Sequence, residues 1–203
     1  MRIVAGRHRG RAITAPADDS VRPTSDRVRE NLFNILAHGK LAPASSGGEG
    51  APLHADARVL DAFAGSGALG LEALSRGAAD AVFIEQDLTA LECLRRNVAA
   101  LGEEKRATLV QADACHPPAP SKVRGNPAPR SLLFLDPPYR SGLAAPALAA
   151  LAESGWLAPG AIAVVELDAK DTFEPPAGFT RADERRYGRT RLLFLRWAKG
   201  KIP

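Results

Sequence analysis

The chain has 203 residues, of which 45% are hydrophobic and 25% charged, which suits one packed globular domain with a small appendage. Its two cysteines and four histidines show no metal-ligand spacing, and no apolar run reaches the length of a membrane span. A disulfide-stabilised domain, a zinc protein and a membrane protein are therefore disfavoured. Because the first residues do not form a signal peptide, we expect a reduced, cytoplasmic protein without a metal.

The net charge of +4 is unevenly distributed along the chain. Residues 1–40 carry a net charge of +4 and residues 181–203 carry +6, whereas residues 41–180 carry −6. Basic ends around an acidic centre are expected if the ends contact a polyphosphate such as a nucleic acid.

The N-terminal stretch predicts a small basic hairpin. Residues 2–13 have apolar ends around a turn-prone centre with two glycines. This pattern predicts a β-hairpin that presents Arg7, His8, Arg9 and Arg11.

A helix and a linker are predicted next. Thr24 or Ser25 can cap a helix in which Val28, Leu32 and Leu36 form part of one apolar stripe. Residues 41–57 are rich in Ala, Gly, Pro and Ser and predict a flexible linker. We therefore divide the chain into an extension (1–40), a linker (41–57) and a main domain (58–203).

The main domain alternates predicted strands with helices, which implies a parallel sheet. We expect strands at 59–62, 81–85, 107–111, 131–135 and 161–166, helices at 67–76, 88–101 and 143–153, and a terminal antiparallel hairpin of 179–187 and 190–197. Residues 115–130 contain five prolines, so a regular helix is not expected there. The predicted fold is a Rossmann-like, mostly parallel seven-stranded sheet with helices on both faces.

A glycine loop follows the first strand of this domain. Residues 61–70 read D-A-F-A-G-S-G-A-L-G, in which Gly65, Gly67 and Gly70 satisfy G-x-G-x-x-G. Glu85 lies twenty positions after Gly65, at the end of the next strand, where it can accept hydrogen bonds from ribose hydroxyls. Several nucleoside cofactors use such a loop, so the pattern alone does not choose among them.

Two further acidic residues favour S-adenosylmethionine. Asp61 directly precedes the loop, where a carboxylate suits the ammonium of an amino-acid ligand better than it suits a pyrophosphate. Asp113, after the third strand, is placed to accept a hydrogen bond from the adenine amine. Three acidic residues at successive strand ends fit one adenosyl ligand that carries positive charge.

The sequence D-P-P-Y follows the fourth predicted strand directly. The apolar residues of that strand do not alternate with polar ones, which indicates a strand buried on both faces. The prolines end the strand, so Asp136 is expected at the edge of the sheet where α/β proteins bind ligands. The Asp136 carboxylate and the Pro137 carbonyl can accept both hydrogens of a base amine, while Tyr139 stacks on the ring that carries it.

Four segments carry a resemblance to a known family. They are M-R-I-V-A-G-R-H-R-G-R at the start, R-P-T-S-D-R-V-R-E-N-L-F-N-I-L from residue 22, the glycine loop, and D-P-P-Y from residue 136; Y-G-R-T at 187–190 is a further common feature. The chain resembles class I methyltransferases, and most closely the RsmD family of bacterial 16S rRNA (guanine-N2)-methyltransferases. The resemblance spans essentially the whole chain, except for the longer linker 41–57 and the proline-rich 115–130.

The resemblance implies methylation of one guanine of 16S rRNA, guanine 966 in this family, by a monomer that acts on an assembling 30S subunit. The site residues fall into three groups. The implied catalytic residues are Asp136, Pro137 and Tyr139. The implied S-adenosylmethionine site contains Asp61, Phe63, Gly65, Gly67, Glu85, Gln86 and Asp113. The implied RNA-binding residues are Arg7, Arg9, Arg11, Arg22, Thr24 and Arg27.

Three other functions remain open from the residues alone. An adenine-N6 DNA methyltransferase would use D-P-P-Y equally well, although the chain lacks an obvious target-recognition domain. A nicotinamide-dependent dehydrogenase is supported only by the glycine pattern and is disfavoured by Asp61. A non-catalytic RNA-binding module would keep the basic ends but would tolerate the loss of Asp136 or Gly65.

Overall fold

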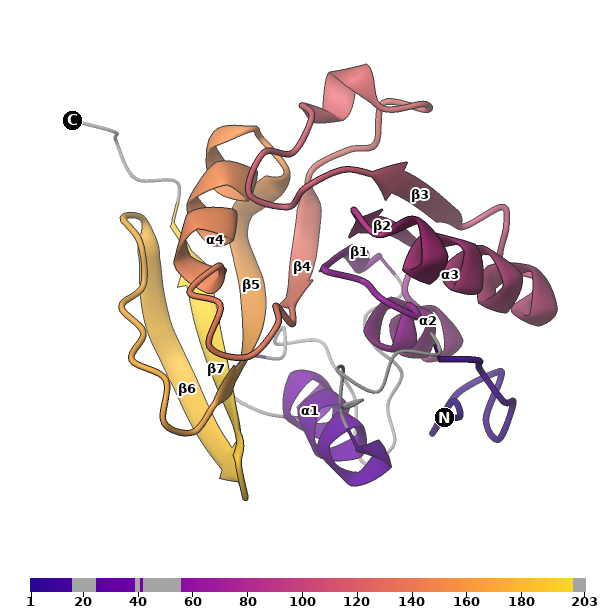
Figure 1. Ribbon diagram of the computed structural model, residues 1–203, viewed down its shortest axis with the longest axis horizontal. Coiled ribbons are helices and arrows are strands. Elements are labelled where there is room, and N and C mark those ends of the chain that lie inside the picture. Colours follow the sequence, from indigo (N-terminus) through magenta and orange to yellow (C-terminus); the bar gives the residue numbers. More distant parts are fainter. Residues whose placement is uncertain (16–24, 39–40, 42–55, 199–203) are drawn as a thin grey trace.

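The computed structural model describes residues 1–15, 25–38, 41 and 56–198. Within them, seven strands form one sheet in the order β3-β2-β1-β4-β5-β7-β6 (Figure 1). Five strands are parallel, namely β1 (Arg58–Ala62), β2 (Asp80–Glu85), β3 (Ala107–Gln111), β4 (Arg130–Leu135) and β5 (Leu157–Asp168). The remaining two, β6 (Phe179–Tyr187) and β7 (Thr190–Trp197), form an antiparallel hairpin on β5. The predicted Rossmann-like sheet is confirmed.

Helices cover both faces of this sheet. The helices α1 (Asp26–His38), α2 (Ala68–Ser75) and α3 (Leu88–Leu101) contribute to one core, and α4 (Ala144–Glu153) contributes to the other. Between β3 and β4 the described chain forms only a short 3₁₀ helix, η1 (Pro120–Lys122), as expected from its prolines. None of the helices in the described ranges is long and apolar enough to cross a membrane.

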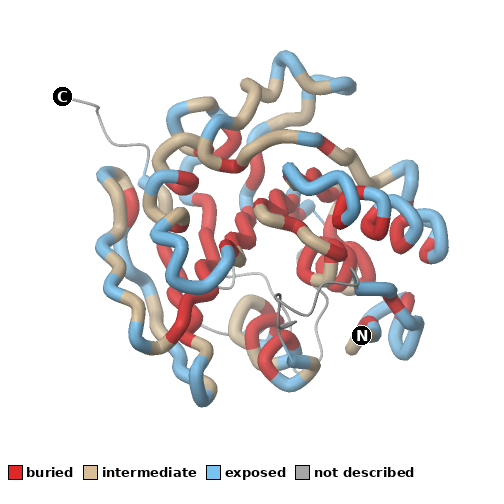
Figure 2. The backbone as a smooth tube through the Cα atoms, in the orientation of Figure 1, coloured by how far each residue is buried: buried red, intermediate tan, exposed pale blue. Residues whose placement is uncertain are grey.

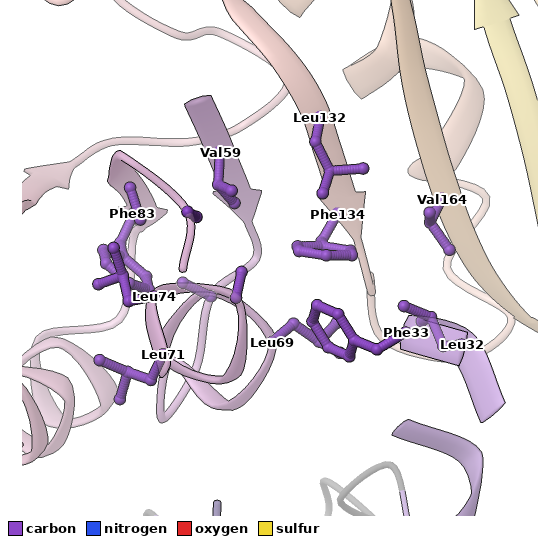
Figure 3. Packing of buried hydrophobic residues seen from close by; sticks show 14 of the residues in the cluster. Leu32, Phe33, Val59, Leu69, Leu71, Leu74, Phe83, Leu132, Phe134 and Val164 are labelled. Carbon is purple, nitrogen blue, oxygen red and sulfur yellow. The ribbon is translucent and has the colours of Figure 1, made fainter. Parts of the chain in front are cut away.

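The continuous apolar sequence of β4 follows from its central position. Leu132 and Phe134 point into the core under α1 and α2, whereas Leu133 and Leu135 point into the core under α4. Figure 3 shows Phe33 of α1 directed at Phe134, with the two ring centroids 5.5 Å apart. A strand with helices on both sides has no solvent face, so all four positions are apolar.

The N-terminal hairpin is smaller than predicted. A single antiparallel bridge joins Arg2 to Ala12, and the turn between them docks on α2 through a 2.8 Å hydrogen bond from the Arg7 amide to the Ser75 carbonyl. His8 is not presented to solvent: it is buried, and its Nε2 lies 2.6 Å from Oε1 of Glu103. The sequence pattern shows a basic turn but not which of its side chains meets a partner distant in the chain, here in the turn after α3.

Two boundary predictions had different outcomes. Of the two proposed caps for α1, Ser25 is the one observed, because its hydroxyl accepts from the Val28 amide at 3.3 Å, whereas Thr24 lies outside the described residues. Strand β5 is longer at both ends than the predicted 161–166. Its neighbours explain the extension, since Leu157 pairs with Arg130 and Asp168 pairs with Thr190.

The sheet reverses its strand order between β1 and β4. From β1 the chain proceeds outward to β2 and β3, then returns to place β4 on the other side of β1. In open α/β sheets, ligands bind outside the carboxyl ends of the strands at such a switch point. Figure 2 shows that the central strands are buried, so the exposed parts of this region are the loops that follow the strands.

Candidate functional site

Two predicted site segments leave adjacent strands at the same level. Ala62, the last residue of β1, pairs with Leu135, the last residue of β4. The next residues in the chain are Phe63 of the glycine loop and Asp136 of D-P-P-Y. Neighbouring strands lie about 4.8 Å apart, so the two segments are brought together at the switch point.

The Glu85 carboxylate links the glycine loop to the start of α3. Its Oε2 accepts from the Gly65 amide at 2.8 Å, and its Oε1 accepts from the Asp87 amide at 2.8 Å. Each carboxylate oxygen has a second lone pair, so these two bonds leave acceptor capacity for ribose hydroxyls. Gln86, between the two acids, is exposed.

The three glycines of the loop meet different requirements. A Cβ at Gly65, where φ is +54°, would meet no atom of the described chain within 4 Å, so this backbone faces open space that a ligand can approach. Gly67 caps α2 with φ +79°, and a Cβ there would meet Cδ1 of Leu94 at 2.3 Å. A Cβ at Gly70 would lie 2.3 Å from the Phe83 ring, so this glycine permits close helix–sheet packing.

Asp61 is more deeply buried than its predicted role suggested. The residue is 2% exposed, and its Oδ2 accepts from the Gly70 amide at 2.8 Å. Burial raises the pKa of Asp61 to about 8, although the Gly70 hydrogen bond opposes the shift. A bound cation such as an ammonium would favour the ionised form and lower this pKa.

Phe63 adopts an unusual backbone conformation for its type. Its φ is +59°, a left-handed value that costs about 1–2 kcal/mol for a residue with a side chain. Such conformations persist where the surrounding structure enforces them, often at binding sites. Here the Ala64 amide donates to the Ile84 carbonyl at 3.1 Å, which ties the turn to β2.

Asp113 lies after β3 and is partly exposed. Its Oδ1 accepts from the Cys115 amide at 2.8 Å, and its Oδ2 lies 2.8 Å from Nδ1 of His116. The His116 hydrogen bond and the Cys115 amide lower the pKa of Asp113. The carboxylate is therefore ionised and can accept a further hydrogen bond, as an adenine amine requires.

The D-P-P-Y corner has a fixed tyrosine. Asp136 is half-buried and Pro137 is buried, while Tyr139 keeps 41% of its surface exposed. The Tyr139 hydroxyl donates to Oε1 of Glu166 at 2.9 Å. Burial and the Glu166 carboxylate raise the pKa of Tyr139, so the hydroxyl remains a donor and the ring is held while part of it faces solvent.

Sequence reasoning missed the group that anchors this ring. Glu166, which accepts from the Tyr139 hydroxyl, is a 3% exposed residue of β5. A signal was present, because Glu166 is a single acid within the otherwise apolar A-I-A-V-V-E-L. Its partner could not be identified without the fold.

Asn97 was also missed. Its Oδ1 accepts from the Thr14 amide at 2.9 Å, while its Nδ2 donates to the carbonyls of Thr14 at 2.8 Å and of Ser66 at 2.9 Å. This buried side chain therefore holds the N-terminal segment against the glycine loop. An asparagine within an amphipathic helix gives no sequence signal for such a link.

Three of the predicted RNA-binding arginines lie away from this site. Arg7, Arg9 and Arg11 are exposed, but their turn lies against the C-terminal ends of α2 and α3, at the amino edge of the parallel strands. Arg27 is exposed in the first turn of α1. Arg22 and Thr24 lie outside the described residues, and so does most of the predicted linker.

The donor set fits the predicted cofactor. Acids at the ends of β1 and β2 and after β3 surround an open glycine backbone, as a cationic adenosyl ligand requires. Within the described ranges, no group of three or more His, Cys, Asp or Glu side chains could hold a metal ion.

The sheet order, the glycine loop at the switch point and the D-P-P-Y corner define a class I methyltransferase. A solved structure of the putative methyltransferase yhhF from Escherichia coli has the same fold, with a TM-score of 0.76 and 36% identity, covering 98% of this chain and 99% of that one. A profile of the family described as Conserved hypothetical protein 95 matches residues 1–196.

Sequence relatives identify the family within this class. Ribosomal RNA small subunit methyltransferase D of Escherichia coli K12 is 38% identical over 203 residues, which covers 99% of this chain and 92% of that protein. The Haemophilus influenzae protein of the same name is 34% identical over 190 residues, covering 93% and 89%. The chain belongs to the RsmD family of methyltransferases.

Proposed function

We propose that the chain transfers the methyl group of S-adenosylmethionine to the exocyclic N2 amine of one guanine, guanine 966, in 16S rRNA. The observation that carries this proposal is the register of β1 and β4, which sets Asp136 beside the glycine loop. Relatives named as small-subunit rRNA methyltransferases support the choice of RNA.

The cofactor would bind across the ends of β1, β2 and β3. Glu85 would hold the ribose, Asp113 the adenine amine and Asp61 the ammonium of the methionine part. Phe63, Gly65 and Gly67 would shape the loop against the ligand, and Gln86 would line its exposed side. Bound there, the cofactor supplies an electrophilic methyl group.

The D-P-P-Y corner would position the acceptor. The flipped guanine would stack on Tyr139, and its amine would donate to the Asp136 carboxylate and the Pro137 carbonyl. These acceptors favour a pyramidal nitrogen whose lone pair can attack. After transfer the nitrogen carries an extra proton, which Asp136 would accept. Orientation can supply about 7–11 kcal/mol of the acceleration.

The substrate would be 16S rRNA within an assembling 30S subunit, with the enzyme acting as a monomer. Exposed Arg7, Arg9 and Arg11 would contact phosphates of RNA distant from the target base, because they lie at the opposite edge of the sheet. We also keep Arg22, Thr24 and Arg27 as proposed RNA contacts.

The decisive variant is Asp136→Ala. We expect it to lower the rate of methyl transfer at least about a hundredfold, since it removes the proposed acceptor and proton-accepting group. Cofactor affinity, measured by calorimetry, should stay within about twofold of wild type. Glu104→Ala is the control, because Glu104 is exposed after α3 and far from the site. Wild-type transfer by Asp136→Ala would refute the role.

The acceptor base is tested on under-methylated small-subunit particles with a tritiated methyl donor, followed by nucleoside analysis. The proposal predicts N2-methylguanosine in 16S rRNA. Recovery of N6-methyladenosine would replace guanine by adenine as the target, and labelling of duplex DNA instead of RNA would support the DNA methyltransferase alternative.

A further inference from the structure

The tip of the β6–β7 hairpin stands beside the D-P-P-Y corner. Val165 of β5 pairs with Leu135, the last residue of β4, but β5 continues for three more residues to Asp168. At about 3.3 Å per residue, β5 extends about 10 Å beyond β4. Asp168 pairs with Thr190, so β7 begins at this extension and the hairpin turn projects from the carboxyl edge of the sheet.

This tip is strongly basic. Residues 185–191 read R-R-Y-G-R-T-R and contain no acid. The Arg185 and Arg186 side chains are 52% and 63% exposed, and their acidic partners precede them on the same strand. The Arg189 side chain is 78% exposed and reaches Asp168 at 3.4 Å. Ion pairs this exposed are weak, so the guanidinium groups can exchange these partners for phosphates.

The cross-strand register places Arg185 on the same face of the sheet as Glu166. Arg185 pairs with Leu192, and Leu192 pairs on its other side with Glu166, so the three side chains lie in one row. Leu192 belongs to the core under α1 and α2. Arg186 instead pairs with Arg191 and points to the opposite face, which α4 covers.

The tip and the D-P-P-Y corner share Asp168 as a neighbour. Arg140 directly follows Tyr139, is exposed and has φ +60°. After the Lys170 amide, which contributes most, Arg189 and Arg140 both lower the pKa of Asp168. Asp168 lies two residues after Glu166, whose carboxylate accepts from the Tyr139 hydroxyl. Basic groups from two separate segments therefore meet near the residue that anchors the ring proposed to stack on the target base.

We propose that Arg140, Arg185 and Arg189 form a phosphate-binding rim that holds the RNA backbone next to the flipped nucleotide. Guanidinium groups bind phosphates in a bidentate manner and fix the register of a nucleic acid. This inference rests on the proposed function and adds a surface to it. The rim lies on the same edge as Asp136, unlike the Arg7–Arg11 turn, so it can act on the nucleotides closest to the base.

The test is the double variant Arg185→Glu with Arg189→Glu, with binding to in vitro transcribed 16S rRNA measured over a range of salt concentrations. Loss of two phosphate contacts should reduce the slope of log affinity against log salt by roughly 1.4. Affinity should fall at least about tenfold. The KM for RNA should rise while kcat at saturating RNA and cofactor affinity change little. Lysines at both positions should restore most of the binding, because they keep the charge.

The matched control is Arg95→Glu with Lys105→Glu, which makes the same change in net charge. Both residues are exposed and belong to α3 and the turn after it, on the side of the molecule away from the hairpin (Figure 1). An equal loss of RNA affinity in this control would overturn the proposed rim, since the affinity would then depend only on total charge. Wild-type affinity and a wild-type salt slope in the hairpin variant would also overturn the proposed rim. If the wild-type enzyme methylates the RNA in that case, the proposed function still holds and only the rim is refuted.

Discussion

Asp61 shows how one residue can serve both the fold and the ligand. Its carboxyl group accepts from the Gly70 amide inside the protein, and burial raises its pKa to about 8. A neutral acid at neutral pH is compatible with folding but poorly suited to hold a cation. We infer that cofactor binding and loss of this proton are coupled, so that cofactor affinity rises with pH.

The same pKa predicts how stability depends on pH. Because the folded chain holds this proton more tightly than the unfolded chain, the contribution of Asp61 is present at low pH and is lost as the pH rises toward 8. Asp61→Asn keeps an acceptor oxygen but cannot ionise. We expect wild type to lose up to about 1.4 kcal/mol more stability per pH unit than this variant between about pH 6 and pH 8, measured by urea unfolding. Identical pH profiles would contradict the shift.

At the scale of elements, the glycine loop separates a folding requirement from a binding requirement. Gly70 lies where α2 approaches the Phe83 ring, whereas the backbone of Gly65 faces open space within the described structure. The two positions belong to one sequence motif, but their surroundings differ.

This difference predicts that alanine mainly lowers stability at Gly70 and mainly lowers cofactor affinity at Gly65. Gly70→Ala should destabilise the fold by about 1–3 kcal/mol, because the added carbon overlaps a buried ring. Gly65→Ala should cost about 1 kcal/mol from backbone strain but should weaken cofactor binding much more, because its Cβ enters the ligand space. Thermal unfolding and calorimetry on both variants distinguish the effects. Equal losses of stability and affinity in the two variants would contradict this division of roles.

At the scale of the whole molecule, the N-terminal extension shares the core of the main domain. Phe33 packs on Phe134 of the central strand, and Cζ of Arg76, the residue after α2, lies 4.8 Å from the centroid of the Phe33 ring. Ile3 and Ile13 are buried in the same core. The proposed RNA-binding extension therefore does not stand apart from the sheet, whatever its contacts with RNA.

Removal of the Phe33 ring should consequently affect the entire protein. We expect Phe33→Ala to lower the free energy of unfolding by about 3–5 kcal/mol, with a single cooperative transition in both circular dichroism and tryptophan fluorescence. Asn34→Ala, at an exposed neighbouring position, is the control. An early separate transition of the N-terminal residues, with the main transition unchanged, would show that the extension folds independently.

The sequence by itself determined the local structure. The bounds of α3 could be predicted because an aspartate precedes the helix and a glycine follows it. In the structure Asp87 accepts from the Ala90 amide at one end, and Gly102 adopts a left-handed conformation at the other. The strands β6 and β7 were likewise predicted from the turn at Gly188 between them. The glycine loop and D-P-P-Y indicated the candidate site because the conformation of each motif depends on only a few consecutive residues.

Only the tertiary structure decided which distant groups meet. The burial of His8 against Glu103, the anchoring of Tyr139 by Glu166 and the link from Asn97 to Ser66 each join residues from separate elements. The tertiary structure also placed Arg7 and Arg189 at opposite edges of the sheet, although both lie in basic segments. Local preferences depend on neighbours in the chain, whereas these contacts depend on strand order and register, which the packing of the whole sheet determines.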